Sequence, residues 1–167
     1  MIREAKVGDS PALMKVASES GLFPPEHLED LRTMLRGHFE AGEKAEGFWL
    51  LHEEQGECLG LAYSEPELMS TGTWNMRLVA VLPERQGRGL GRALVRATEK
   101  EVRKREGRLL LVDTSGLADF QYVRDFYENC GFEREALIKD FFEDGDDKVT
   151  FVKRVGQEVE SLDWLPS

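Results

Sequence analysis

The sequence predicts a single α/β domain built on a mixed β-sheet, and three features of the chain carry this prediction. An apolar run at residues 78–82 is followed by a glycine-rich turn and then by a helical pattern of apolar residues. A second apolar run, Leu109–Val112, comes after that helix, so that strand, helix and strand form a right-handed crossover unit with parallel strands. Pairs of strand-like segments joined by polar turns that contain a glycine, on both sides of this unit, predict hairpins that complete the sheet.

The N-terminal half carries signals for two helices between short strands. Pro11 follows a capping residue, Asp9 or Ser10, and marks the first turn of a helix that Gly21 ends. In the next helix apolar residues recur every three or four positions, which gives it one apolar face. A polar turn containing Gly56 predicts a hairpin. The expected elements are a strand within 1–6, helices at about 10–20 and 24–41, strands at 48–52 and 58–63, a loop at 65–73 and a central strand at 74–82.

The C-terminal half begins where Pro83 ends the central strand, because proline has no N–H for a sheet ladder. Leu90, Ala93, Leu94 and Ala97 then fall at helical spacing. An acidic turn with a central glycine joins the last two strands. The expected elements are a helix to about 105, a strand at 108–113 covered on both faces, a short helix at 123–130, strands at 132–142 and 148–155, and an acidic tail at 156–167.

Composition limits the classes of function that the chain can serve. It has 167 residues, of which 41% are apolar and 32% charged, and a formal net charge of −10. Such acidity argues against nucleic acid or an anionic membrane as partner, and it permits a cationic substrate. Cys58 and Cys130 form neither a zinc-site spacing nor a disulfide framework, so we expect free thiols, no metal and a cytoplasmic protein. No apolar run approaches the length of a membrane span.

Three glycines, Gly87, Gly89 and Gly91, lie two residues apart between the central strand and the following helix. Glycine lets a ligand approach the backbone closely, and the first N–H groups of a helix have no partner within it. We therefore expect this turn to bind an anion, phosphate above all. Three arginines would add positive charge at the same place: Arg85, Arg88 and Arg92.

Three phosphate-binding motifs compete for this turn. A P-loop is excluded because no Lys-Ser or Lys-Thr pair follows the glycines. The dinucleotide fingerprint G-x-G-x-x-G fits Gly87 and Gly89, and Asp113 lies where a ribose-binding acid belongs. Arg92, however, takes the place of its third glycine, and only about fifty residues follow Asp113, too few for the rest of a doubly wound sheet. The third motif, Q/R-x-x-G-x-G/A, matches in full at 86–91.

This third motif resembles the acetyl-CoA-binding motif of the GNAT N-acetyltransferase superfamily. The V-x-P run that ends at Pro83 and the F-Y-x-x-x-G-F run at 126–132 strengthen the resemblance, which spans about residues 2–155. It implies the GNAT fold: a mixed, mostly antiparallel sheet with a central pair of parallel, splayed strands, flanked by helices. It implies one acetyltransferase domain at 1–155, followed by the acidic tail.

The resemblance also implies how acetyl-CoA binds. The pantetheine arm would pair with the backbone of the central strand at Val79 and Val81, and the N–H of Val81 would face the oxyanion formed on attack. The positions that would hold the pyrophosphate are Gln86, Gly87, Arg88, Gly89, Leu90, Gly91 and Arg92.

The catalytic groups are less completely implied. Tyr127 matches the tyrosine that in many members protonates the departing CoA thiolate, although it would serve equally as a core aromatic. The central strand lacks the glutamate that many members use as a base and offers Asn75 and Arg77 instead. Asp113 is therefore our first candidate for proton relay, although a capping role would also explain it. Glu65 and Glu67 are the next candidates.

The chain is thus predicted to be an acyltransferase that moves an acetyl group from acetyl-CoA to a primary amine by direct attack. Acidic residues on the segments that bind the acceptor in this family favour a small cationic amine, a lysine or an N-terminal amine: Glu26, Glu29, Asp30, Asp140, Glu143, Asp144, Asp146 and Asp147. The alternative is a CoA-binding sensor without chemistry, supported by the missing carboxylate on the central strand. We expect a monomer or a homodimer that binds neither nucleic acid nor membrane.

Overall fold

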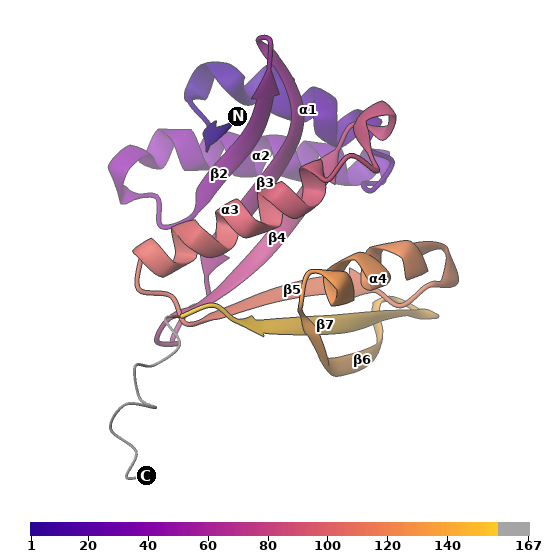
Figure 1. Ribbon diagram of the computed structural model, residues 1–167. Helices are drawn as coiled ribbons and strands as arrows, with labels where there is room; N and C mark the ends of the chain where they lie inside the picture. Colours follow the sequence, from indigo (N-terminus) through magenta and orange to yellow (C-terminus); the bar gives the residue numbers. More distant parts are fainter. Residues whose placement is uncertain (157–167) are drawn as a thin grey trace, which may run out of the picture. The chain divides into compact units, whose positions relative to one another are not determined.

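The structure is a computed structural model of the chain, and it describes residues 1–156. Apart from Gly156, the predicted acidic tail lies outside the described residues. The helices and strands are β1 (Ile2–Glu4), α1 (Ser10–Glu19), α2 (Pro25–Ala41), β2 (Phe48–Glu54), β3 (Glu57–Pro66), β4 (Thr73–Val81), α3 (Leu90–Lys104), β5 (Leu109–Ser115), α4 (Gln121–Asn129), β6 (Glu133–Glu143) and β7 (Asp146–Arg154). Figure 1 follows them along the chain.

Among the described residues the strands form one mixed sheet in the order β1-β2-β3-β4-β5-β7-β6. β4 and β5 are parallel, with pairing from Thr73 opposite Leu109 to Asn75 opposite Leu111, whereas the pairs β1–β2, β2–β3, β5–β7 and β6–β7 are antiparallel. The strand order and pairing confirm the predicted mixed, mostly antiparallel sheet with a central parallel pair, and helices flank this sheet as predicted.

Two compact units divide the chain. The N-terminal unit comprises Met1–Glu65 and Arg77–Thr98, and the C-terminal unit comprises Pro66–Met76 and the chain from Glu99 onward. Strand β4 and helix α3 each contribute residues to both units. The units are described one at a time below.

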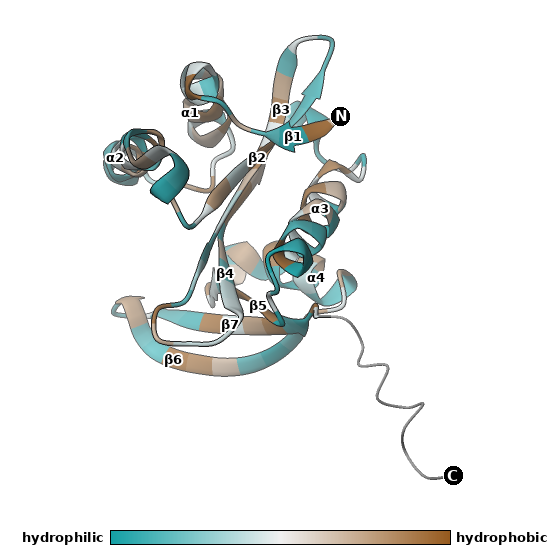
Figure 2. Cartoon of the chain, turned by 90° about the vertical axis from the view of Figure 1, so that its left-hand side faces the viewer, coloured by the Kyte–Doolittle hydropathy of each residue, from teal (hydrophilic) through white to brown (hydrophobic). Residues whose placement is uncertain are grey.

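The core of the N-terminal unit lies between its strands and the helix pair α1 and α2. Leu13 and Val16 of α1 and Leu31 and Leu35 of α2 bury the apolar faces that their spacing predicts. They pack on every second residue of β2 and β3, where the side chains point toward the helices: Trp49, Leu51, Leu59, Leu61 and Tyr63. Figure 2 shows the two helices on one side of these strands and α3 on the other.

Asp9 has a different role from the one predicted for it. It occupies the N-cap position of α1, yet its side chain makes no capping hydrogen bond. The carboxylate instead accepts two hydrogen bonds from Arg3, at 2.8 and 3.0 Å, and one from the backbone N–H of Lys6 at 2.7 Å. Arg3 also donates to Glu53 of β2. The bidentate guanidinium is the stronger partner, and it holds the pKa of Asp9 below its usual value.

The C-terminal unit packs α4 against β5, β6 and β7. Along β5 buried and half-buried residues alternate, so one face is fully covered and the other only in part, whereas the apolar run had predicted full cover on both faces. Tyr127 and Phe126 of α4 lie beside each other, and Tyr127 also meets Phe132 and Phe151. The last hairpin closes at Gly145, which adopts a φ of 89° as the Asp-Gly turn requires.

Two boundaries matter for the site. Strand β3 runs to Pro66, so Glu65 lies in a strand and not in the predicted loop. A short 3-10 turn, Pro83–Arg85, lies between β4 and the glycines. Gly91 is the second residue of α3, and only Gly87 and Gly89 lie in the turn itself.

Candidate active site

The glycine turn adopts a backbone that other residues seldom adopt. Gly87 and Gly89 have φ angles of 79° and 80°, in the left-handed region where a Cβ is strained. A Cβ built on either glycine would meet nothing within 4 Å, so the turn is open on its outer side. The turn is exposed from Gln86 through Gly89. Glycine is thus needed here for conformation and for the approach of a ligand.

Helix α3 begins directly behind this turn. The N–H of Ala93 donates to the carbonyl of Gly89 at 3.0 Å, which is the first bond of the helix. The N–H groups of Leu90, Gly91 and Arg92 therefore have no carbonyl to bind within the helix. Their dipoles point into the turn, where an anion would be stabilised. Arg88 lies within the glycine turn and Arg92 in the first turn of α3, and both side chains are exposed.

Strand β4 offers one edge to a ligand. The N–H of Leu82 donates to the carbonyl of Leu59 on β3 at 2.9 Å. Successive residues of an extended strand turn their N–H groups to opposite edges, so Val79 and Val81 direct theirs away from β3. Gln86 reaches back and donates its side-chain amide to the carbonyl of Val81 at 3.2 Å. Gln86 therefore ties the glycine turn to the strand edge.

Neighbouring aromatic rings pack around the ring of Tyr127, and its hydroxyl has no hydrogen-bond partner among the described residues. The residue is 5% exposed, and three phenylalanine rings surround it. Its hydroxyl makes no hydrogen bond with the residues that the structure describes. Burial raises the pKa of this hydroxyl above its ordinary value, with a smaller contribution from Cys130, so Tyr127 stays protonated at neutral pH. A buried tyrosine usually finds a partner for its hydroxyl, which makes this group a candidate for contact with a ligand.

Asp113 lies in a polar network within the C-terminal unit. One carboxylate oxygen accepts from the hydroxyl of Thr150 at 2.7 Å, directly across the β5–β7 ladder. The other accepts from the side-chain amide of Asn75 at 3.2 Å, and that amide also donates to Glu67 at 3.0 Å. The carbonyl oxygen of Asn75 is buried and has no partner among the described residues. Each oxygen of Asp113 therefore accepts at least one hydrogen bond, which fixes the orientation of the carboxylate.

Glu65 belongs to a second polar cluster, in the N-terminal unit. Its two oxygens accept from the hydroxyl of Tyr63 and from Nε of Arg77, each at 2.9 Å. Tyr63 stacks on Trp49, with ring centroids 4.5 Å apart. Burial, followed by the neighbouring Glu65, raises the pKa of Tyr63, so this hydroxyl is also protonated at neutral pH. Glu65 is half-exposed and thus reachable from solvent.

The predicted site residues therefore fall into two groups. Val79, Val81 and the glycine turn with the start of α3 lie together in the N-terminal unit, and Tyr127 and Asp113 lie in the C-terminal unit. Sequence reasoning missed the hydroxyl of Thr150 as a partner of Asp113. The only signal available was that both residues lie on strands with side chains alternating between faces, which does not determine the register between strands.

Several acidic residues of the last hairpin serve the hairpin itself. Asp147 accepts from the N–H of Asp140, and Asp140 accepts from the N–H of Gly145. Asp146 accepts from the hydroxyl of Ser115. These carboxylates stabilise the turn, which leaves Glu143 and Asp144 as the exposed acids at its tip.

The described residues set two further limits on the site. Within 1–156 there is no cluster of three or more His, Cys, Asp and Glu side chains able to hold a metal ion. None of the helices in this part of the chain has the length and apolar character needed to cross a membrane.

Comparison with known proteins identifies the family. A family model described as an acetyltransferase (GNAT) domain matches residues 44–134. A crystal structure of a putative GNAT acetyltransferase from Desulfovibrio desulfuricans is 32% identical, with a TM-score of 0.89 over 93% of this chain and 98% of that one. The chain belongs to the GNAT acetyltransferase family. No curated protein matches the sequence.

Two more distant structures share the GNAT fold. The ribosomal-protein-S18-alanine N-acetyltransferase from Escherichia coli is 19% identical, with a TM-score of 0.77 over 96% of both chains. The PaiA N-acetyltransferase from Thermoplasma acidophilum, solved in complex with coenzyme A, is 18% identical, with a TM-score of 0.72 over 92% of this chain and 98% of that one. At this identity the likeness concerns the fold alone.

The glycine turn yields a prediction about binding. We expect Gly89→Glu to weaken the binding of CoA about a hundredfold, because a like charge placed against a diphosphate costs several kcal/mol. Gly56→Glu is the matched control, since Gly56 also has a positive φ, of 79°, and open space around its Cβ position. Isothermal titration of both variants with CoA measures the effect. Equal affinities in the two variants would contradict the assignment of the turn.

Proposed function

We propose that this GNAT family member is an acetyl-CoA-dependent N-acetyltransferase that transfers the acetyl group directly to a primary amine. The observation that carries the proposal is the glycine turn before α3, with its open outer side and the N-terminus of the helix directly behind it. Family membership supports the reaction class. The fold relative from Thermoplasma acidophilum, which was solved with coenzyme A, supports the cofactor.

The N-terminal unit would bind the cofactor. The diphosphate would accept hydrogen bonds from the turn and from the N–H groups of Leu90, Gly91 and Arg92, with Arg88 adding positive charge. The pantetheine arm, which carries amide groups, would pair with the edge of β4 at Val79 and Val81 as an added strand. The N–H of Val81 would then stabilise the oxyanion that forms on attack.

The reaction requires a neutral amine. A lysine-like amine has a pKa of ~10.4, so holding it neutral at pH 7 costs roughly 4.6 kcal/mol. Its nitrogen attacks the thioester carbonyl, a C–N bond forms, the C–S bond breaks, and the electron pair leaves on sulfur. One proton must leave the nitrogen and one must reach the thiolate.

We assign the second of these proton transfers to Tyr127. The packed ring holds the hydroxyl in place, and no residue that the structure describes competes for its hydrogen bond. Because burial raises its pKa, the hydroxyl is protonated at the pH of the reaction and available as a donor to sulfur. Tyr127 regains a proton from solvent or from the amine in each turnover.

We infer that Asp113 acts by positioning, although the sequence predicts proton relay for it. Both of its oxygens already accept hydrogen bonds, from Asn75 and Thr150. By holding the amide of Asn75, Asp113 fixes the direction of the buried, unsatisfied carbonyl oxygen of that residue. A ligand N–H would satisfy this oxygen, which makes Asn75 a candidate contact for the substrate or the pantetheine.

The acceptor we favour is cationic. The exposed acids Glu143 and Asp144 at the tip of the last hairpin and the net charge of −10 both attract a positively charged amine. A small polyamine, an amino sugar, a lysine or an N-terminal amine fits this chemistry. The competing interpretation is a CoA sensor without chemistry, for which the lack of a carboxylate on β4 remains the supporting observation.

A panel of acceptors tests the function directly. We expect release of CoA from acetyl-CoA in the presence of polyamines, amino sugars or lysine-containing peptides, and little with neutral-side-chain amines of the same size, because the acidic surface attracts cations. Thiol release and mass spectrometry of the products measure it. Binding of CoA without turnover of any amine would support the sensor instead.

The role of Tyr127 has a separate test. We expect Tyr127→Phe to lower kcat about a hundredfold with the Kd for CoA unchanged, because general acid catalysis contributes at least that much. Tyr122→Phe is the control: it lies on the same helix, is 57% exposed and should keep the wild-type rate. An undiminished kcat in Tyr127→Phe would leave Tyr127 a core aromatic.

The pH–rate profile decides between the two roles of Asp113. If Asp113 is a positioning residue, Asp113→Asn should lower kcat/KM about tenfold, which is the effect of one lost hydrogen bond. The acidic limb of the pH–rate profile should then stay in place. Thr150→Val removes the partner hydroxyl and should give a similar loss with the same profile. Disappearance of the acidic limb in Asp113→Asn alone would instead identify Asp113 as the base.

A further inference from the structure

Helix α4 buries a charged side chain on the same face as Tyr127. The buried residues of this helix are Arg124 and Tyr127, which are three positions apart and so lie one turn from each other. Arg124 is only 7% exposed. Arginine is almost never buried to this degree unless it is paired, yet no carboxylate among the described residues forms an ion pair with Arg124. Its guanidinium is therefore held by uncharged groups.

Three oxygen atoms accept the hydrogen bonds of Arg124. Its Nη1 donates to the backbone carbonyls of Ser115 and Leu117, the second at 2.9 Å. Its Nη2 donates to the side-chain oxygen of Gln121, also at 2.9 Å. The amide of Gln121 is itself oriented, because its nitrogen donates to Asp125 at 2.8 Å and leaves the oxygen for Arg124. The guanidinium thus joins the first turn of α4 to the loop that follows β5.

The loop that Arg124 binds is also fixed to the sheet. The hydroxyl of Ser115 donates to Asp146, and the N–H of Gly116 donates to the carbonyl of Asp147 at 2.8 Å. Both of these acceptors belong to β7. A guanidinium presents its donors in a rigid planar fork, so it fixes direction as well as distance. Arg124 therefore sets the start of α4 against a part of the chain whose own position is determined by β5 and β7.

The N-terminus of α4 has no capping side chain to do this instead. Phe120 occupies the N-cap position and makes no side-chain capping hydrogen bond. A polar side chain at that position usually satisfies the first N–H groups of a helix. One turn beyond Arg124, the side chain of Tyr127 is held by aromatic packing. Apolar packing is not directional, whereas hydrogen bonds are, so the bonds of Arg124 are the ones that define how α4 is oriented.

We propose that Arg124 is a positioning residue for Tyr127. It fixes the rotation of α4 and its position along the helix axis, and Tyr127 on the same face takes its place from the helix. The inference rests on the role proposed above for Tyr127, the donation of a proton to the CoA thiolate. A proton donor must lie within hydrogen-bond reach of its acceptor, so a small displacement of the helix lowers the rate. Arg124 transfers no proton and acts through Tyr127.

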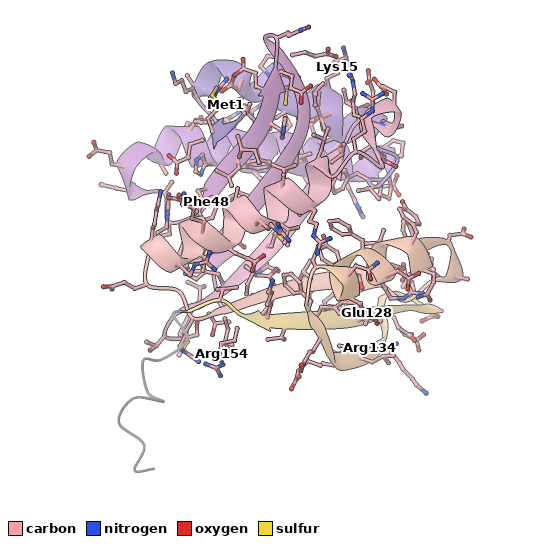
Figure 3. The ribbon with its side chains drawn as sticks, viewed as in Figure 1. Met1, Lys15, Phe48, Glu128, Arg134 and Arg154 are labelled. Carbon is pink, nitrogen blue, oxygen red and sulfur yellow. The ribbon has the colours of Figure 1, made fainter. Side chains whose placement is uncertain are left out.

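Steady-state kinetics of Arg124→Lys test the proposal. Lysine keeps the charge but lacks the planar fork that reaches two carbonyls and Gln121 together. We expect kcat to fall about tenfold with the KM for acetyl-CoA nearly unchanged, because a displaced catalytic group loses rate and not ground-state binding. Arg134→Lys is the matched control, since Arg134 is exposed on β6, where Figure 3 labels it, and should keep the wild-type rate. A wild-type kcat in Arg124→Lys overturns the proposal.

A second variant leaves the buried charge in place. Gln121 is exposed, and Gln121→Met removes one of the three acceptors of Arg124. We expect this variant to lower kcat about threefold, the effect of one weak hydrogen bond, with its thermal unfolding close to that of the wild type. If Arg124→Lys does not fold, this variant carries the test, and a wild-type kcat in it then contradicts the proposal.

A double-mutant cycle separates positioning from general damage to the fold. If Arg124 acts through Tyr127, adding Arg124→Lys to Tyr127→Phe should lower kcat no further, so the double variant should match Tyr127→Phe alone. Losses that multiply in full would show that Arg124 acts elsewhere, which refutes this inference and leaves the role of Tyr127 intact. A wild-type kcat in Tyr127→Phe itself would refute the proposed role of Tyr127, and this inference with it.

Discussion

The candidate site depends on one constraint of the backbone: the first N–H groups of α3 cannot be satisfied by the helix. The helix makes its first bond from Ala93 to Gly89, so the N–H groups ahead of Ala93 need a partner from outside. Gly87 and Gly89 keep the chain in left-handed conformations that leave the approach to these groups open. A turn of ordinary residues would either strain the backbone or fill that space with side chains. The arginines that follow add charge, but the geometry of the amides comes first.

The strand before this turn is subject to a related requirement. Val81 is buried, yet its N–H points away from β3, and pairing with β5 covers only Thr73–Asn75 at the start of β4. Buried backbone groups are nearly always paired, so this part of β4 is suited to a ligand that brings its own amides. Gln86 connects the two requirements, because its side chain holds the carbonyl of Val81 while its backbone leads into Gly87. The glycine turn and the strand edge are therefore tied to each other within one unit.

Much of this could be predicted from sequence because the signals are local. Glycines between a strand and a helix identify the turn, and the spacing of Phe126, Tyr127 and Cys130 places the tyrosine on a short helix. The partners of Asp113 could not be predicted, because Asn75 and Thr150 lie 38 and 37 residues away and the strand register alone brings them together. Asp9 does take the predicted N-cap position, but its side chain makes no capping bond because Arg3, six residues away, binds the carboxylate. The position of β6 at the edge of the sheet could not be predicted either, because the sequence indicates a strand there but not its place in the sheet order.

Two uncharged polar groups of the C-terminal unit, the hydroxyl of Tyr127 and the carbonyl oxygen of Asn75, favour an enzyme over a CoA-binding module more clearly than the carboxylates of this unit do. A tyrosine kept only for packing gains nothing from a hydroxyl, since phenylalanine fills the same space without the cost of burying a polar group. Tyr127 retains the hydroxyl, in a position where no described residue accepts its hydrogen bond. The buried carbonyl oxygen of Asn75 is likewise unsatisfied, although Asp113 and Glu67 hold the amide of the same side chain. A donor and an acceptor that have no partner among the described residues suit a site for a transient ligand, because groups already bonded to each other would have to be separated before they could act.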